Sequence, residues 1–147
     1  MGLICLFAFC SLALALLGGR AYRQIQAGVE DSFGSTVAAS HLRTKLSQNN
    51  AVGAVSLRDE GGVQVLAIAT TTGEADYETR IYLHEGTLWE RFVTADTPFS
   101  TVGGIQIAQL ARCTFAISPD GLFTSEIESS EGSVVRVAFA LAEGGVL

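Results

Sequence analysis

Every charged side chain of this 147-residue chain lies after residue 19. The run from Leu3 to Leu17 holds only apolar residues, cysteines and one serine, and Gly18 and Gly19 extend the uncharged stretch. As a helix rising ~1.5 Å per residue it spans roughly 28 Å, close to the ~30 Å hydrocarbon core of a bilayer. Backbone groups in lipid must pair internally, so the run is expected to be helical. We therefore predict a transmembrane anchor over residues 1–19, with residues 3–19 in the membrane.

A cleaved signal peptide is the alternative to this anchor. Ala13 and Ala15 have the small-x-small spacing that signal peptidase prefers, and the apolar run before them has the length of a signal core. The segment before that run carries no Lys or Arg, unlike the start of a signal peptide, which favours a retained anchor.

The net charge and the cysteine spacing of the chain disfavour nucleic-acid binding and metal or redox chemistry. The formal net charge of −6 disfavours direct nucleic-acid binding, which needs clustered Lys and Arg to meet phosphates. Cys5, Cys10 and Cys113 form no metal-binding or redox spacing, so we expect small buried side chains and no metal or cofactor.

An amphipathic helix is predicted over residues 20–50. Apolar residues recur there every four positions, at Ile25, Val29, Phe33 and Val37. We expect this stripe to pack on a sheet or on neighbouring helices.

Residues 51–147 have the period-two pattern of β-strands, separated by short Gly-rich turns. Val63–Thr70 is apolar on both faces, as in a central strand, and Glu85-Gly86 is typical of a tight hairpin. Short connections make neighbouring strands antiparallel. The sequence thus predicts an α+β fold, in which a long transmembrane and amphipathic helix precedes an antiparallel meander of six or seven strands.

Three segments carry a family resemblance: Ala38–Val55, the hairpin Asp76–Phe92, and the closing stretch from Gly121 to Leu141. They are similar to a small bacterial family of unknown function whose members look like minor type IV pilins or pseudopilins. The resemblance implies a pilin-like, single-pass membrane protein. Its β domain would lie outside the cytoplasm and contact other envelope proteins, as in a secretion or DNA-uptake apparatus.

Four side chains of the β region are candidates for a partner contact: Tyr82, Trp89, Arg91 and Phe99. Large aromatic residues and arginines are frequent in protein interfaces when they are exposed. A covering loop, helix or second layer is the alternative for these residues.

No residue pattern predicts catalysis, so we expect a protein that is not an enzyme. His84-Glu85 lacks the spacing of a helical metal-binding motif, and no serine lies in a nucleophile-elbow motif. The second hypothesis for function is an extracytoplasmic ligand-binding module, which would use the loop Thr94–Gly104 and the acidic turns.

Overall fold

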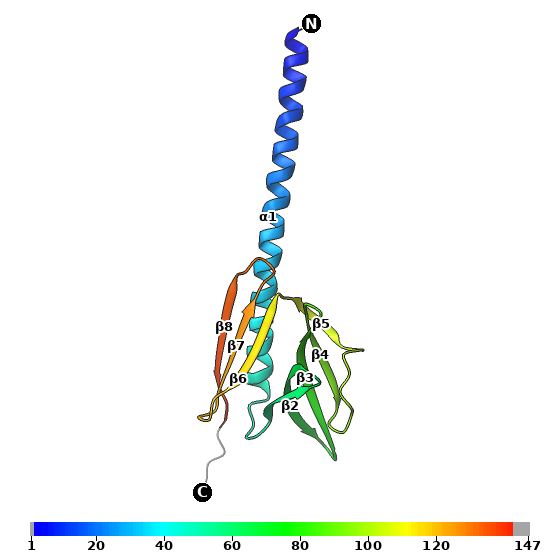
Figure 1. Ribbon diagram of the computed structural model, residues 1–147, viewed down its shortest axis with the longest axis vertical. Helices are drawn as coiled ribbons and strands as arrows, with labels where there is room; N and C mark the ends of the chain where they lie inside the picture. The colour runs from blue at the N-terminus through cyan, green and yellow to red at the C-terminus, as the bar shows by residue number, and fades with distance from the viewer. Residues whose placement is uncertain (1, 143–147) are drawn as a thin grey trace.

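The computed structural model describes the backbone of residues 2–142 and the side chains of residues 2–8, 10–13 and 33–142. One helix, α1 (Gly2–Gln48), precedes all strands (Figure 1). The strands are β1 (Val55–Glu60), β2 (Val63–Thr72), β3 (Ala75–His84), β4 (Thr87–Thr94), β5 (Ile105–Gln109), β6 (Arg112–Ile117), β7 (Leu122–Glu128) and β8 (Val134–Ala140).

The first five strands form one antiparallel sheet in the order β1-β2-β3-β4-β5. The hairpin between β3 and β4 turns at Glu85 and Gly86, whose φ angles are 50° and 73°. Two positive φ angles fit the twist of a two-residue hairpin, as the sequence predicted. Residues Val65 to Ile68 of β2 are buried on both faces, which confirms the predicted central strand.

The last three strands form a second antiparallel sheet in the order β6-β7-β8. The side-chain amide of Gln64, in β2, joins this sheet to the first. Its Nε2 donates to the Phe115 carbonyl at 2.7 Å, and its Oε1 accepts from the Phe115 N–H at 2.9 Å. The amide of one side chain thus pairs both backbone groups of Phe115 in β6.

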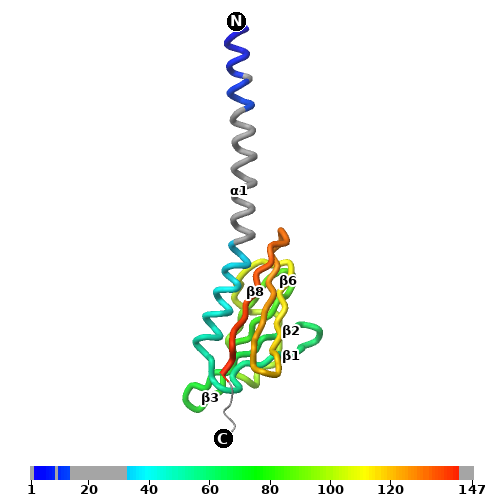
Figure 2. The backbone as a smooth tube through the Cα atoms, turned by 90° about the vertical axis from the view of Figure 1, so that its left-hand side faces the viewer, coloured from blue at the N-terminus to red at the C-terminus, as the bar shows by residue number. Residues whose placement is uncertain are grey.

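The carboxyl-terminal part of α1 packs against both sheets and contacts β5, β7 and β8. Figures 1 and 2 show this part of the helix running past the two sheets. Leu42 and Leu46 are fully buried there. They join Leu66 and Ile81 of the first sheet and Phe123 of the second in one apolar core.

The expected fold class is wrong. Eight strands form two separate sheets, whereas a single meander of six or seven strands was predicted. Among the described residues no helix combines the length and apolar character that crossing a membrane requires, so the expected long apolar helix is not found.

The predicted helix stripe is displaced. Phe33 is 66 % exposed and Val37 is half-buried, whereas Ala38 is fully buried. A Cβ added at Gly34 would lie 3.3 Å from the Gln109 carbonyl oxygen, so the helix approaches β5 through its small residues. The space between the helix and β5 is too small for a large side chain such as Phe33, which is exposed to solvent. Ile25 and Val29 lie outside the described side chains.

Candidate functional site

The predicted contact residues share one face of the five-stranded sheet. Side chains alternate along a strand, and Tyr82 of β3 lies opposite Trp89 of β4, as Arg80 lies opposite Arg91. The other face of these strands carries Ile81 and belongs to the core. We call the first face, which points away from the core, the outer face.

The loop between β4 and β5 covers part of the outer face. The Tyr82 hydroxyl donates to the Ser100 carbonyl at 3.4 Å, and Arg91 Nη1 donates to the same oxygen at 2.9 Å. Phe99 packs edge-on against Tyr82, with ring centroids 5.2 Å apart. Burial raises the pKa of Tyr82, and the Arg91 charge partly offsets this rise.

Tyr82, one of the four candidates for partner contact, is fully buried. Trp89, Arg91 and Phe99 are half-buried. The Trp89 indole N–H donates to the His84 carbonyl at 3.4 Å. The covering loop was the alternative that the sequence left open, and partner contact at these residues remains a prediction.

A buried ion-pair cluster on the outer face was missed by sequence reasoning. Glu78 is 2 % exposed and receives both terminal nitrogens of Arg58, at 3.2 and 2.9 Å. Arg80 Nε also contacts Glu78 Oε1. Arg80 Nη1 is buried and has no hydrogen-bond partner within the described residues. The alternation of Glu78 and Arg80 along β3 was the available signal, because it places both side chains on one face.

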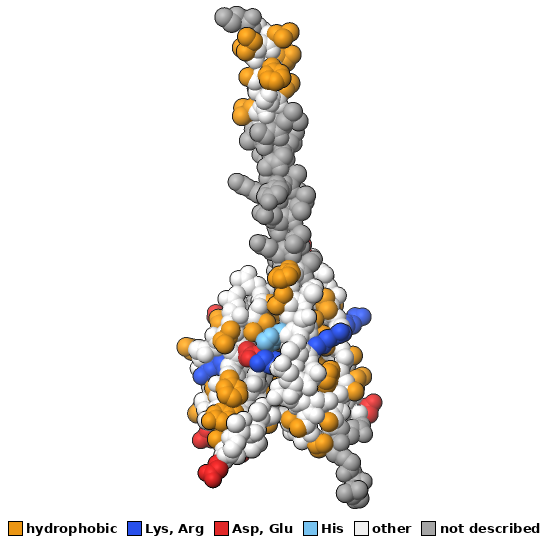
Figure 3. Space-filling view, turned by 180° about the vertical axis from the view of Figure 1, so that it is seen from behind, with side chains coloured by type: hydrophobic (Ala, Val, Ile, Leu, Met, Phe, Trp, Pro, Cys, Tyr) orange, Lys and Arg blue, Asp and Glu red, His pale blue; other side chains and the backbone are white. Residues whose placement is uncertain are grey.

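A second missed cluster joins α1 to β4 on the core side of the sheet. Lys45 Nζ lies 2.8 Å from Glu90 Oε1, and His41 Nε2 contacts Glu90 Oε2. Burial by itself raises the pKa of Glu90, but the hydrogen bonds and charges of Lys45 and His41 outweigh it and hold that pKa below 4.5. Figure 3 shows basic, acidic and histidine side chains meeting in the middle of one side of the molecule. In the sequence, the cluster was indicated only by the four-residue spacing of His41 and Lys45, which places them one helical turn apart.

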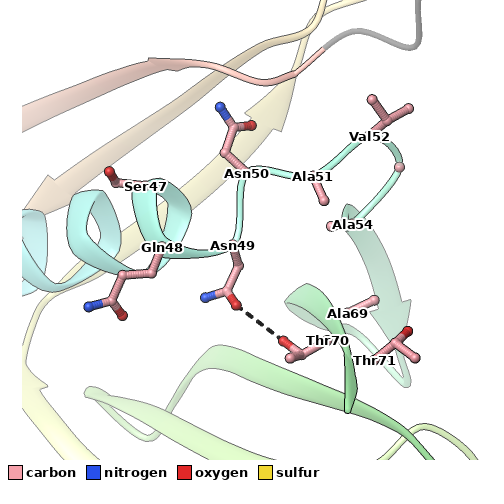
Figure 4. Close-up of a pocket in the computed structure, with 11 residues that line it drawn as sticks. Ser47, Gln48, Asn49, Asn50, Ala51, Val52, Ala54, Ala69, Thr70 and Thr71 are labelled. Atoms are coloured by element: carbon pink, nitrogen blue, oxygen red, sulfur yellow. Dashed lines mark hydrogen bonds between the residues drawn. The ribbon is translucent and has the colours of Figure 1, made fainter. Parts of the chain in front are cut away.

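A groove of about 640 Å³ lies where α1 ends, between residues 47–54 and the end of β2. Figure 4 shows the Asn49 amide turned towards Thr70, whose hydroxyl lies 3.2 Å from Asn49 Oδ1. The side chains of Ser47, Gln48 and Asn50 point in different directions. The groove therefore does not gather polar groups around one ligand position.

Elsewhere in the described part of the chain, side chains that could act in catalysis or bind a metal do not cluster. His84 Nε2 and Glu85 Oε1 lie 3.9 Å apart at an exposed hairpin. Within the residues that the structure describes, no group of three His, Cys, Asp or Glu side chains could hold a metal ion. Burial raises the pKa of the Cys113 thiol to about 11, which keeps that thiol protonated near neutral pH.

The amino-terminal segment of α1, Gly2–Ala13, exposes large apolar side chains (Figure 3). They are Leu3, Ile4, Leu6, Phe7 and Leu12, with exposed fractions between 60 and 83 %. The segment contains no charged residue. An exposed apolar surface of this kind marks contact with another apolar surface.

The chain belongs to the family described as a domain of unknown function, DUF4860, because residues 33–130, about two thirds of its length, match that family model. The match begins in the buried part of α1 and includes β1 to β7. The resemblance to an uncharacterised family is thereby confirmed, whereas the likeness to pilins is not. No curated protein and no solved structure matches the chain.

Proposed function

We propose that this family member is a non-enzymatic protein of the cell envelope, which attaches to lipid through Gly2–Ala13 and presents its β domain to other proteins. The observation that carries this proposal is the exposure of five large apolar side chains on an uncharged helical segment. Burying each one is worth about 1.5–3 kcal/mol, so together they favour an apolar environment by on the order of 10 kcal/mol. An uncharged helical surface with exposed large apolar side chains favours contact with lipid over contact with water.

A contact role is supported by the way the polar groups of the β domain are used. The carboxylate of Glu78 is held by two arginines, and that of Glu90 is held by Lys45 and His41. These ion pairs connect structural elements of the domain, and their charged groups do not line a shared cavity. An extracytoplasmic β domain and a place in a secretion or DNA-uptake apparatus are the finer parts of the proposal, and they rest on the sequence resemblance.

Flotation of the purified full-length chain with neutral phosphatidylcholine vesicles tests lipid attachment. We expect the protein to float with the vesicles and the double variant Leu6→Asp/Phe7→Asp to remain in the dense fraction. Each substitution removes an apolar side chain whose burial is worth about 1.5–3 kcal/mol, so each is expected to weaken partitioning at least tenfold.

Phe92→Asp provides the matched control, because Phe92 is 62 % exposed but lies on the β domain. This variant is expected to float as the unchanged protein does. Lipid attachment through Gly2–Ala13 is refuted if the unchanged chain stays in the dense fraction, or if Phe92→Asp abolishes flotation as the double variant does.

A further inference from the structure

On the outer face of the five-stranded sheet, Arg91 is an arginine without an acidic partner among the described residues. Arg80 and Arg91 lie directly opposite each other on β3 and β4, where like charges repel. Glu78 is ion-paired with Arg58 and Arg80. Glu60 on β1 and Asp76 on β3 share this face by alternation, and Asp76 Oδ1 receives the Thr71 hydroxyl. Arg91 makes no ion pair with any acid in the described part of the chain.

The Ser100 carbonyl oxygen occupies the position where an anion would be held. It receives Arg91 Nη1 at 2.9 Å and the Tyr82 hydroxyl at 3.4 Å. A carboxylate oxygen at this position would receive the same two donors, and it would add the attraction between two opposite full charges to the hydrogen bond from Arg91. The loop thus covers the donors with a weaker acceptor from its own backbone.

A second arginine on the outer face has one nitrogen that lacks a hydrogen-bond acceptor in the described part of the chain. Arg80 is 5 % exposed, and its Nη1 has no partner within the described residues. A buried donor without an acceptor destabilises the fold, and an anion that bound beside Arg80 would reduce this cost. Among the residues that the structure describes, Arg80 thus lacks one acceptor, and Arg91 bonds to a neutral carbonyl where an acid could bind.

We propose that the outer face is a docking site for an acidic segment of a partner protein, whose carboxylate replaces the Ser100 carbonyl at Arg91 and Tyr82. The loop Ala95–Gly104 lies over this site and must shift to admit the segment. A carboxylate is the matched ligand, because the planar guanidinium of Arg91 can bind both carboxylate oxygens at once. This inference deepens the proposed contact role and depends on it only for the choice of a protein as the ligand.

Gly104 provides a means of shifting the loop. A Cβ added there would lie 3.2 Å from Arg91 Cγ, 3.2 Å from the Glu90 carbonyl oxygen and 3.3 Å from the Tyr82 hydroxyl oxygen. Such contacts are tighter than ordinary packing allows, so Gly104→Ala is expected to push the loop off the two donors. The variant keeps both donor groups, although the added Cβ also contacts the side chains that carry them.

The test measures binding of a fluorescent six-residue glutamate peptide to the full-length protein by anisotropy. We expect Arg91→Gln to weaken binding at least tenfold and Gly104→Ala to strengthen it several-fold. Tyr82→Phe removes only the hydroxyl and is expected to weaken binding two- to fivefold. Trp89, the only tryptophan of the chain, lies on this face, so its emission should shift as the peptide binds.

Arg136→Gln is the matched control, because Arg136 lies on β8 in the other sheet and its side chain is 80 % exposed. It should bind the peptide within twofold of the unchanged protein. A six-residue glutamine peptide should not bind, and inorganic phosphate should not compete at the same charge concentration. Circular dichroism establishes that each variant is folded, and Tyr82→Phe keeps the test valid if Arg91→Gln does not fold.

Four results would overturn the docking site: no binding of the glutamate peptide, equal binding of the glutamine peptide, equal losses in Arg91→Gln and Arg136→Gln, or full competition by phosphate. The last would indicate a general anion site. Vesicle flotation of Arg91→Gln separates this inference from the proposed function, because that variant should lose peptide binding and keep lipid attachment. Failure of flotation alone would leave the docking site standing.

Discussion

At the scale of single residues, Glu90 joins the helix to the five-stranded sheet. It accepts from Lys45 and His41, which lie 45 and 49 positions away in the chain. The side chains of both donors are about one quarter exposed, whereas that of Glu90 is 11 % exposed. The carboxylate is therefore the buried partner, and its charge is retained because two cationic donors compensate its burial.

This arrangement predicts a pH-dependent contribution of Glu90 to stability. Its folded-state pKa lies below 4.5, so the stabilisation is fully present above the unfolded-state pKa and is lost as the pH falls through the folded-state pKa. We expect Glu90→Gln to lower the free energy of unfolding by about 1–3 kcal/mol at neutral pH. The difference should shrink below about pH 5. Urea unfolding of both proteins across this pH range measures it.

The exposed Glu131 supplies the control for that series. Glu131→Gln should change the free energy of unfolding by less than about 0.5 kcal/mol at every pH. An effect of Glu90→Gln that stays constant from neutral to acidic pH would contradict the assigned role of its charge.

Two apolar residues of α1 give a further prediction, because one is buried and the other is not. Leu42 is fully buried, and Leu42→Ala should lower the free energy of unfolding by about 2–5 kcal/mol through lost packing and a residual cavity. Phe33→Ala should change it by less than about 0.5 kcal/mol, because Phe33 is 66 % exposed. Chemical denaturation measures both, and a larger loss in Phe33→Ala would place the packed stripe where the sequence pattern first suggested.

At the scale of elements, the strands themselves were largely predictable and their grouping was not. Val63–Thr70, which was predicted as a central strand, lies within β2, and the β3–β4 hairpin turns where Glu85-Gly86 indicated. The missed feature is the change of sheet between β5 and β6. There the Leu110 N–H bonds to the Gly86 carbonyl in one sheet, and the next amide, of Ala111, bonds to Glu128 in the other. The periodicity of a segment depends only on its own residues, so it does not predict which distant strand the segment pairs with.

The Gln64 link between the sheets can be tested through its hydrogen bonds. Gln64→Met keeps a similar length but leaves the Phe115 N–H and carbonyl without the amide. We expect a loss of about 1–3 kcal/mol in unfolding free energy and faster hydrogen exchange of the Phe115 amide. Gln106→Met, at an exposed position of β5, should change neither. Unchanged exchange at Phe115 in Gln64→Met would show that this link does not hold β6.

At the scale of the whole molecule, the helix and both sheets share a single apolar core. Leu42 of α1, Ile81 of β3 and Phe123 of β7 all belong to it. The candidate site depends on the same long-range organisation. Alternation placed Tyr82, Trp89 and Arg91 near one another, but the covering of Tyr82 by the Ser100 carbonyl arises from a loop whose path no periodic pattern encodes.

A shared core predicts that the two sheets unfold together. Phe123 is fully buried in the three-stranded sheet, and Trp89 reports on the five-stranded sheet. Phe123→Ala should lower the free energy of unfolding by about 3–5 kcal/mol. Because the sheets are packed around one cluster, the transition seen by Trp89 fluorescence should shift as far as that seen by far-ultraviolet circular dichroism. A Trp89 transition that stays in place while the dichroism signal divides into two steps would mean that each sheet folds around a core of its own.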